Sequence, residues 1–291
     1  MNVFFVSNST CYFFTDELFG LLSAAGHDDA TLALVYFGGC SVRQHCEWLR
    51  ESASNYEFRV IDKNGLHTSP NRSLISALGE KDWDVISFDN NALTFAAGEM
   101  QAALDITEPY FGELLSKLQK QFPQARYLWH EAWANEIGYN GSFELKTKEH
   151  RDRVFTAKHE LMKHMMKHYG IEGVPTGDAW EKVRDLPLFT APFGPFEGVE
   201  RFTLNSRVHE GAFFDDLSHD GDIGGGQYLN ACVWFEILTG ESCVGNPFRP
   251  TYEFEGQNVR LTEEKIGILQ NAAHEAVAEY RIFCADLLSK Q

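Results

Sequence analysis

Basic residues are scarce in this sequence. Only 25 of the 291 residues are Lys or Arg, against 42 Asp or Glu, and the formal net charge is −17. A strongly acidic surface repels both phosphate backbones and anionic lipid headgroups. We therefore expect neither nucleic acid nor a membrane surface as a partner.

Cysteine pairs and long apolar runs are missing as well. The six cysteines lie far apart and form no Cys-x-x-Cys pair, so we expect reduced thiols and no metal site. No apolar run approaches the length that spans a bilayer. The N-terminus lacks the basic start and long apolar stretch of a signal peptide, which predicts a cytoplasmic location, or a secreted or periplasmic one if a leader has been removed.

Nothing in the sequence marks a domain boundary. It contains no Pro/Ser-rich linker, no block of like charges and no repeat period. Hydrophobic residues make up 44% of the chain, which is ample for a large buried core. We therefore expect one domain over residues 1–291.

Short β-rich apolar runs alternate with longer segments of helical period. This alternation predicts βαβ units and a mainly parallel sheet. The expected strands cover residues 2–6, 31–36, 84–88, 126–129 and a short stretch near Val174. Residues 56–69 read as a strand running into a turn, which predicts an antiparallel excursion beside the main sheet. One expected helix begins at Thr15. Further helices are expected over residues 107–121, 147–169, 226–238 and 262–288.

Polar residues follow the expected strands. They occur at residues 7–10, 38–41, 89–91 and 130–133. Ligands of an open parallel sheet bind beyond the carboxyl ends of its strands, so these segments predict a site at one sheet edge.

One serine and one late pair of residues suggest acyl transfer. A serine becomes a good nucleophile when a histidine accepts its proton and a carboxylate orients that histidine. Asp216 and His219 are three residues apart, which suits this pairing, and Ser9 is the candidate nucleophile. The backbone N–H groups of Ser9 and Gly39 and the amide of Asn90 are candidate donors to an oxyanion.

The segments after the strands also resemble a known family. Residues 7–9, 38–41, 83–90 and 216–219 look like the blocks of SGNH (GDSL-like) hydrolases. The likeness is greatest to a poorly characterised bacterial branch that is often found among glycan-degrading genes. The run from residue 226 to 240 is similar to that branch too, so the resemblance covers residues 2 to about 245.

This resemblance implies a three-layer α/β/α sandwich with a mainly parallel, flavodoxin-like sheet of five strands. It further implies a catalytic triad of Ser9, Asp216 and His219, with an oxyanion hole formed by Ser9, Gly39 and Asn90. The implied activity is that of an esterase that removes an acyl group such as acetyl from a carbohydrate through an acyl-enzyme. Neither a metal nor an organic cofactor is implied.

The chain departs from the family pattern at two positions. Ser7 stands where the first block usually has Gly, so the turn must tolerate a side chain. Asp89 opens the third block, which leaves the third oxyanion donor open between Asn90 and Asn91. These departures motivate an alternative in which the protein keeps the fold and binds carbohydrate without turnover.

Three further alternatives stay open. Ser7 could replace Ser9 as the nucleophile, and Asp215 competes with Asp216 for the orienting role. A glycosidase that uses Asp89 and Glu131 as its carboxylate pair is the third.

Aromatic residues after the fourth expected strand could bind the substrate. Trp129 and Trp133 are either core residues or a stacking platform for a sugar, with Glu131 or His130 as a polar contact. Residues 159–164 nearly match a zinc-protease helix motif, but their histidines are five residues apart instead of four. Five residues turn a helix about 140° past one full turn, so this segment predicts a solvated helix face. The sequence leaves the oligomeric state open.

Overall fold

In a computed structural model of the whole chain, the structure describes residues 1–89, 98–134, 147–189, 225–254 and 257–288. The strands of the main sheet are β1 Asn2–Ser7, β2 Thr31–Tyr36, β3 Tyr56–Asp62, β4 Gly65–Arg72, β5 Val85–Asp89, β6 Arg126–His130 and β7 Glu172–Val174. A separate hairpin consists of β8 Thr251–Phe254 and β9 Gln257–Arg260. The helices are α1 Ser9–Tyr12, α2 Thr15–Ala24, α3 Val42–Glu51, α4 Leu74–Leu78, α6 Met100–Gln121, α7 Lys148–Tyr169, α8 Thr176–Val183, α9 Gly226–Thr239 and α10 Glu263–Leu288.

The main sheet has seven strands in the order β4-β3-β2-β1-β5-β6-β7. The strands β2, β1, β5, β6 and β7 are parallel to one another, as expected. The predicted number of five is wrong, because β3 and β4 belong to the same sheet. The predicted antiparallel excursion forms β3, which bonds directly to β2 in antiparallel register, with Leu32 opposite Ile61.

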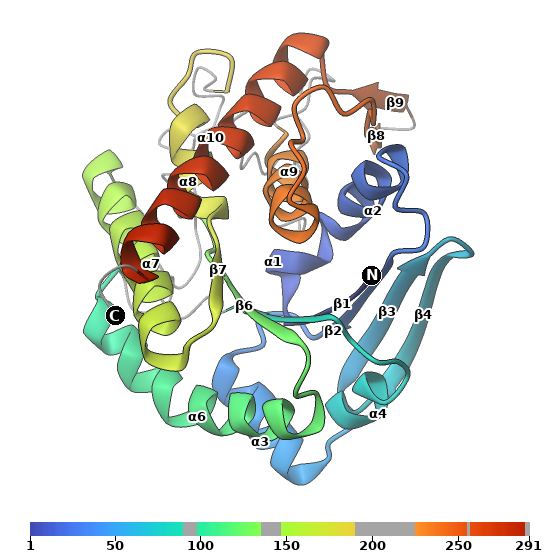
Figure 1. Cartoon of the computed structure of the whole chain (residues 1–291), viewed down its shortest axis with the longest axis vertical. Coiled ribbons are helices and arrows are strands. Elements are labelled where there is room, and N and C mark those ends of the chain that lie inside the picture. Colours follow the sequence, from blue (N-terminus) through green and yellow to red (C-terminus); the bar gives the residue numbers. More distant parts are fainter. Residues whose placement is uncertain (90–97, 135–146, 190–224, 255–256, 289–291) are drawn as a thin grey trace.

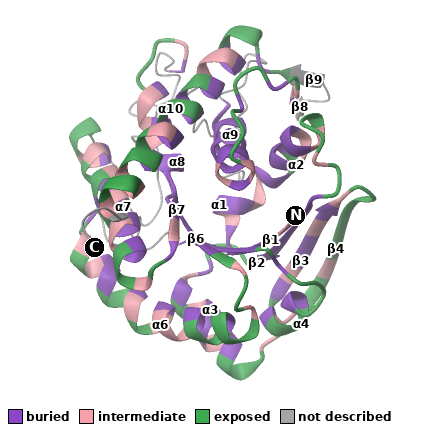
Figure 2. Cartoon of the chain, viewed as in Figure 1, coloured by how far each residue is buried: buried purple, intermediate pink, exposed green. Residues whose placement is uncertain are grey.

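Helices cover both faces of the sheet (Figure 1). Val3 and Phe5 of β1 point into a core formed with α2, α8, α9 and α10. Phe4 and Val6 alternate with them and point into a second core formed with α3, α6 and α7. Because β1 is covered on both faces, its apolar run is continuous instead of alternating. Figure 2 shows β1 buried within the layers.

Helix α9 lies inside the first core, where it packs against one face of the sheet. Twelve of its residues are buried. The indole of Trp234 packs edge-on against Phe5, with ring centroids 5.0 Å apart, and against His130, with centroids 5.6 Å apart. This helix therefore connects the hydrophobic core with a polar residue at the end of β6.

Most of the predicted helices are confirmed. Helix α7 begins where expected, since the Thr147 hydroxyl caps it by accepting from the N–H of His150 at 3.1 Å. Helix α6 begins at Met100 instead of Thr107 and contains Pro109. The short helices α3 and α8 were not predicted. In the described part of the chain, we find no helix both long and apolar enough to cross a bilayer.

Candidate active site

Three parallel strands deliver polar side chains to one edge of the sheet. Strand β1 ends at Ser7, β5 at Asp89 and β6 at His130, and β5 pairs with both β1 and β6. Parallel neighbours present their carboxyl ends at the same edge. The predicted convergence of these segments is therefore present in the fold.

Ser9 lies on a tight connection between β1 and α1. Asn8 caps α1, and its side-chain oxygen accepts from the N–H of Thr10 at 2.9 Å and from the Thr10 hydroxyl at 2.7 Å. Ser7, Asn8, Thr10 and Cys11 are buried, whereas Ser9 is half-buried. Within this segment, Ser9 is thus the residue whose hydroxyl is open to solvent.

The two departures from the family pattern contact each other. The Ser7 hydroxyl donates to Oδ2 of Asp89 at 2.5 Å, and Nδ2 of Asn8 donates to Oδ1 of the same carboxylate at 3.2 Å. Ser7 needs no positive φ here, because it continues the extended backbone of β1. Asp89 therefore holds the two residues that precede Ser9, instead of facing an oxyanion freely.

The loop after β2 is tied to the same segment. Nδ2 of Asn8 also donates to the carbonyl of Cys40 at 3.1 Å. Gly39, next to Cys40, has a φ of +66°, and among the described residues other than its chain neighbours none comes within 4 Å of the place where a side chain would begin. A positive φ favours glycine at this position. The geometry is compatible with an N–H donor role for Gly39, which stays a prediction.

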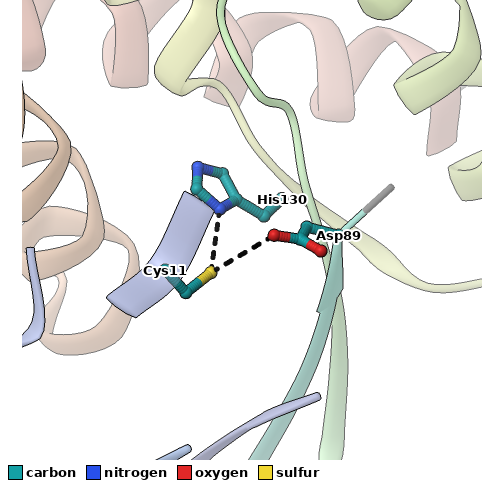
Figure 3. Close-up of side chains that lie close together, drawn as sticks. All are labelled: Cys11, Asp89 and His130. Carbon is teal, nitrogen blue, oxygen red and sulfur yellow. Dashed lines mark hydrogen bonds between the residues drawn. The ribbon is translucent and has the colours of Figure 1, made fainter. Parts of the chain in front are cut away.

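Cys11 bridges Asp89 and His130 (Figure 3). Its sulfur lies 3.2 Å from Nδ1 of His130 and 3.8 Å from Oδ2 of Asp89. Burial raises the pKa of Cys11 well above its usual value and lowers the pKa of His130 to about 3. The thiol and the imidazole are therefore both neutral near pH 7, which does not suit a thiolate nucleophile.

Burial raises the pKa of Asp89 to about 6, although its hydrogen bonds from Ser7, Thr10 and Cys11 lower it. An unfolded Asp has a pKa of about 3.9. Since the folded state binds the proton more tightly, this contribution to stability is present below pH 4 and is lost as the pH rises through about 6.

We therefore expect the pH to change the stability of the wild type relative to an Asp89→Asn variant. Between pH 4 and pH 7, the free energy of unfolding of the wild type should fall relative to that of the variant by on the order of 2 to 3 kcal/mol. Urea unfolding of both proteins at several pH values measures it. A difference that stays constant would show that Asp89 does not titrate in this range.

A second polar network lies beside the first, after β6. The buried Glu131 accepts from the N–H of Asp178 at 3.2 Å, and Nδ1 of His159 lies 3.0 Å from both carboxylates. The contacts with Asp178 and Glu131 raise the pKa of His159 to about 10. The predicted solvated face for residues 159–164 is therefore wrong at His159, because that ring sits between two carboxylates.

Two buried basic side chains hold the same loop. Nζ of Lys158 donates to the carbonyl of Trp133 at 2.7 Å, and the Arg184 guanidinium donates to the carbonyl of Ala134 at 2.8 Å. Both side chains are only 3% exposed. Sequence reasoning missed these residues, since a Lys within α7 and an Arg just after α8 carry no signal that they point inward.

The predicted substrate contacts after β6 are buried. Trp129 belongs to the core under α6 and α7, and Trp133 stacks on Trp180 with ring centroids 4.5 Å apart. Trp129, Glu131 and Trp133 are 2%, 1% and 1% exposed. The packing thus supports the interpretation of Trp129 and Trp133 as core residues. A role of these three residues in substrate binding stays a prediction.

Several predicted site residues lie outside the described residues. These are Asn90, Asn91, Asp215, Asp216 and His219. The roles assigned to them stay predictions.

Comparisons with known proteins place the chain in a family. Residues 7–185 match the model of a domain of unknown function, DUF4886. A crystal structure of a DUF4886 family protein from Bacteroides uniformis is similar over 96% of this chain and 95% of that one, with 22% identity and a TM-score of 0.72. The chain therefore shares the fold of that protein.

More distant likenesses are to hydrolases. A crystal structure of an acetyl xylan esterase is 13% identical over 60% of this chain and 76% of that one, with a TM-score of 0.37. A GDSL-like lipase from Bacteroides thetaiotaomicron is 10% identical over 66% of this chain and 71% of that one, with a TM-score of 0.34. A comparison with curated proteins finds no match.

Proposed function

We propose that this chain, which belongs to the DUF4886 family, is a serine esterase that removes an acyl group such as acetyl from a carbohydrate. The observation that carries the proposal is the placement of Ser9. Its side chain is the accessible hydroxyl of a segment whose other polar side chains are buried and bonded to one another. That segment ends β1, the central strand of the seven-stranded sheet, at the carboxyl edge of its parallel strands, where such folds bind ligands.

In the proposed reaction, the Ser9 hydroxyl attacks the ester carbonyl while His219 accepts its proton. Asp216 holds the imidazole in the required tautomer. The N–H groups of Ser9 and Gly39 and the amide of Asn90 stabilise the oxyanion. The protonated His219 gives its proton to the leaving sugar alcohol, and a water activated by the same histidine then releases the acid and restores Ser9.

The surroundings of Asp89 support this role for the segment. Asn8 is fixed by the carboxylate of Asp89, by the carbonyl of Cys40 and by Thr10. A nucleophile held in one geometry reacts faster than one that must be ordered during the reaction. The network around Asn8 supplies this kind of preorganisation to the residue that follows it.

Labelling with a fluorophosphonate probe tests the proposal. The probe forms a covalent bond with an activated serine, so we expect the wild type to be labelled at Ser9, as read by mass spectrometry of the peptide. The Ser9→Ala variant should not be labelled. Ser23→Ala is the matched control, because Ser23 is also half-buried but lies on α2, and it should be labelled like the wild type.

The same experiment separates the alternatives. A protein that is not labelled but binds an acetylated oligosaccharide in calorimetry would be the binding-only form, and labelling at Ser7 would identify that residue as the nucleophile. The glycosidase alternative has little support, since the carboxyls of Asp89 and Glu131 are both buried and both already bonded to protein groups. Release of acetate without cleavage of glycosidic bonds would contradict it directly.

A further inference from the structure

Helices α6 and α7 bring three metal-binding side chains together, none of which contributes to the networks described above. Glu108 lies on α6, and His164 and His168 lie on α7. Nε2 of His164 is 2.5 Å from Oε1 of Glu108, and the two imidazole rings are nearly parallel, with centroids 5.4 Å apart. One ligand atom from each of the three residues lies within 4.8 Å of the others.

The spacing of the two histidines suits chelation. Residues four apart on a helix lie on the same face, one turn above the other. The pair formed by His159 and His164 has five-residue spacing and diverges, whereas His164 and His168 have the four-residue spacing that metal-binding helices use. Ligands of one tetrahedral zinc ion lie about 3.3 Å apart, as follows from bond lengths near 2 Å. On metal binding, the exposed His168 ring would have to turn toward the ion, and Oε1 of Glu108 and Nε2 of His164, now 2.5 Å apart, would have to separate slightly.

The surroundings favour a cation at this place. Glu108 and His164 are about one-third exposed and His168 is more so, which leaves an ion a path from solvent and an open coordination position. The nearest lysines of α7 point elsewhere, because Lys163 and Lys167 both lie over the ring of Phe283 on α10. The net charge of −17 also attracts cations.

Two other groups of potential ligands in the described part of the chain are less suitable. Cys11, Asp89 and His130 are completely enclosed, and Asp89 is already bonded to Ser7 and Asn8. The group of Glu131, His159 and Asp178 supplies a single imidazole, whereas Glu108, His164 and His168 supply two. Glu131 is also buried and already accepts the N–H of Asp178.

We propose that Glu108, His164 and His168 form a binding site for a divalent first-row transition metal ion, with Zn²⁺ as the preferred occupant, that links α6 to α7. Two imidazoles and one carboxylate are a donor set that zinc uses in proteins, with water in the fourth position. The site is separate from the proposed esterase site and does not depend on it.

Calorimetric titration of the metal-free full-length protein with Zn²⁺ tests this proposal. We expect one Zn²⁺ ion per chain at this site, and a rise in Tm of roughly 5 °C when free Zn²⁺ is about 100-fold above Kd. His168→Ala should weaken the binding at least tenfold. Loss of a residue that only hydrogen-bonds to a metal ligand already costs about 10- to 100-fold in metal affinity, and His168 would be a ligand itself. Glu108→Gln should weaken it in the same direction. Co²⁺ absorption of the loaded protein reports whether nitrogen and oxygen ligands surround the ion.

Two controls make the result decisive. His67→Ala removes an exposed histidine of β4 that is remote from this site, and it should leave both the affinity and the stoichiometry unchanged. His168 is exposed, so its replacement should leave the Tm of the metal-free protein unchanged. Binding that survives His168→Ala, or that is equally sensitive to His67→Ala, would overturn the proposal, as would the absence of any Zn²⁺ binding.

Discussion

Replacement of His219 by Ala is expected to lower kcat for hydrolysis of an acetate ester by a factor on the order of 10⁴ to 10⁶, with little change in KM. The reason is that Ser9 attacks only as fast as its proton is accepted, and the loss of the base removes this step without removing substrate contacts. Steady-state kinetics with an aryl acetate and with an acetylated oligosaccharide measure the effect. His130, the histidine at the end of β6, cannot substitute, because it is buried and its Nδ1 faces Cys11.

Three further variants sharpen this prediction. Asp216→Asn should lower kcat by about 10⁴-fold, since it stabilises the wrong tautomer of the base. Asp215→Asn should stay within a few-fold of the wild type, and the exposed His67→Ala should behave like the wild type. A His219→Ala enzyme that keeps activity within tenfold of the wild type would exclude the proposed triad. A large effect of Asp215→Asn would instead show that Asp215, and not Asp216, orients the histidine.

The regular elements of the fold are largely predictable from the sequence. The apolar runs of β1, β2, β5 and β6 and the periodic segments of α7, α9 and α10 each carry a strong local signal. The main error concerns the sheet, where the pattern of residues 56–69 identifies a strand but does not say that it bonds to β2. Pairing between strands is a long-range contact, and the periodicity of one segment does not contain it.

The side-chain networks of the site are much less predictable. The sequence locates Ser9, Asp89 and His130 at strand ends, because position after an apolar run is a local feature. It does not show that the hydroxyl of Ser7 bonds to Asp89, or that Lys158 and His159 turn inward from a charged helix. Such contacts depend on the rotation of a helix against the sheet, and each appears in the sequence as an ordinary polar residue.

The contact between Ser7 and Asp89 gives the second large effect that we expect, now on stability. Asp89→Ala should lower the free energy of unfolding by about 2 to 4 kcal/mol, because the buried donors of Ser7 and Asn8 lose their acceptor. Ser7→Ala should cost about 1 to 2 kcal/mol. The double variant should be more stable than the sum of both effects predicts, by about 1 to 3 kcal/mol, since the second change removes a donor that the first had left unpaired. Urea unfolding of the four proteins measures this coupling.

The chain itself contains a matched control for this cycle. Ser23 donates to Asp28 through the same pair of side-chain groups, but on the surface. Water replaces a lost partner there, so the coupling between Ser23→Ala and Asp28→Ala should stay below about 0.5 kcal/mol. If the contact also positions the nucleophile, Ser7→Ala and Asp89→Ala should each slow labelling of Ser9 by about 10- to 100-fold, because small displacements of reacting groups are costly. Equal coupling in the two cycles would show that burial adds nothing to the Ser7–Asp89 contact, and unchanged labelling would show that the pair stabilises the fold without aligning Ser9.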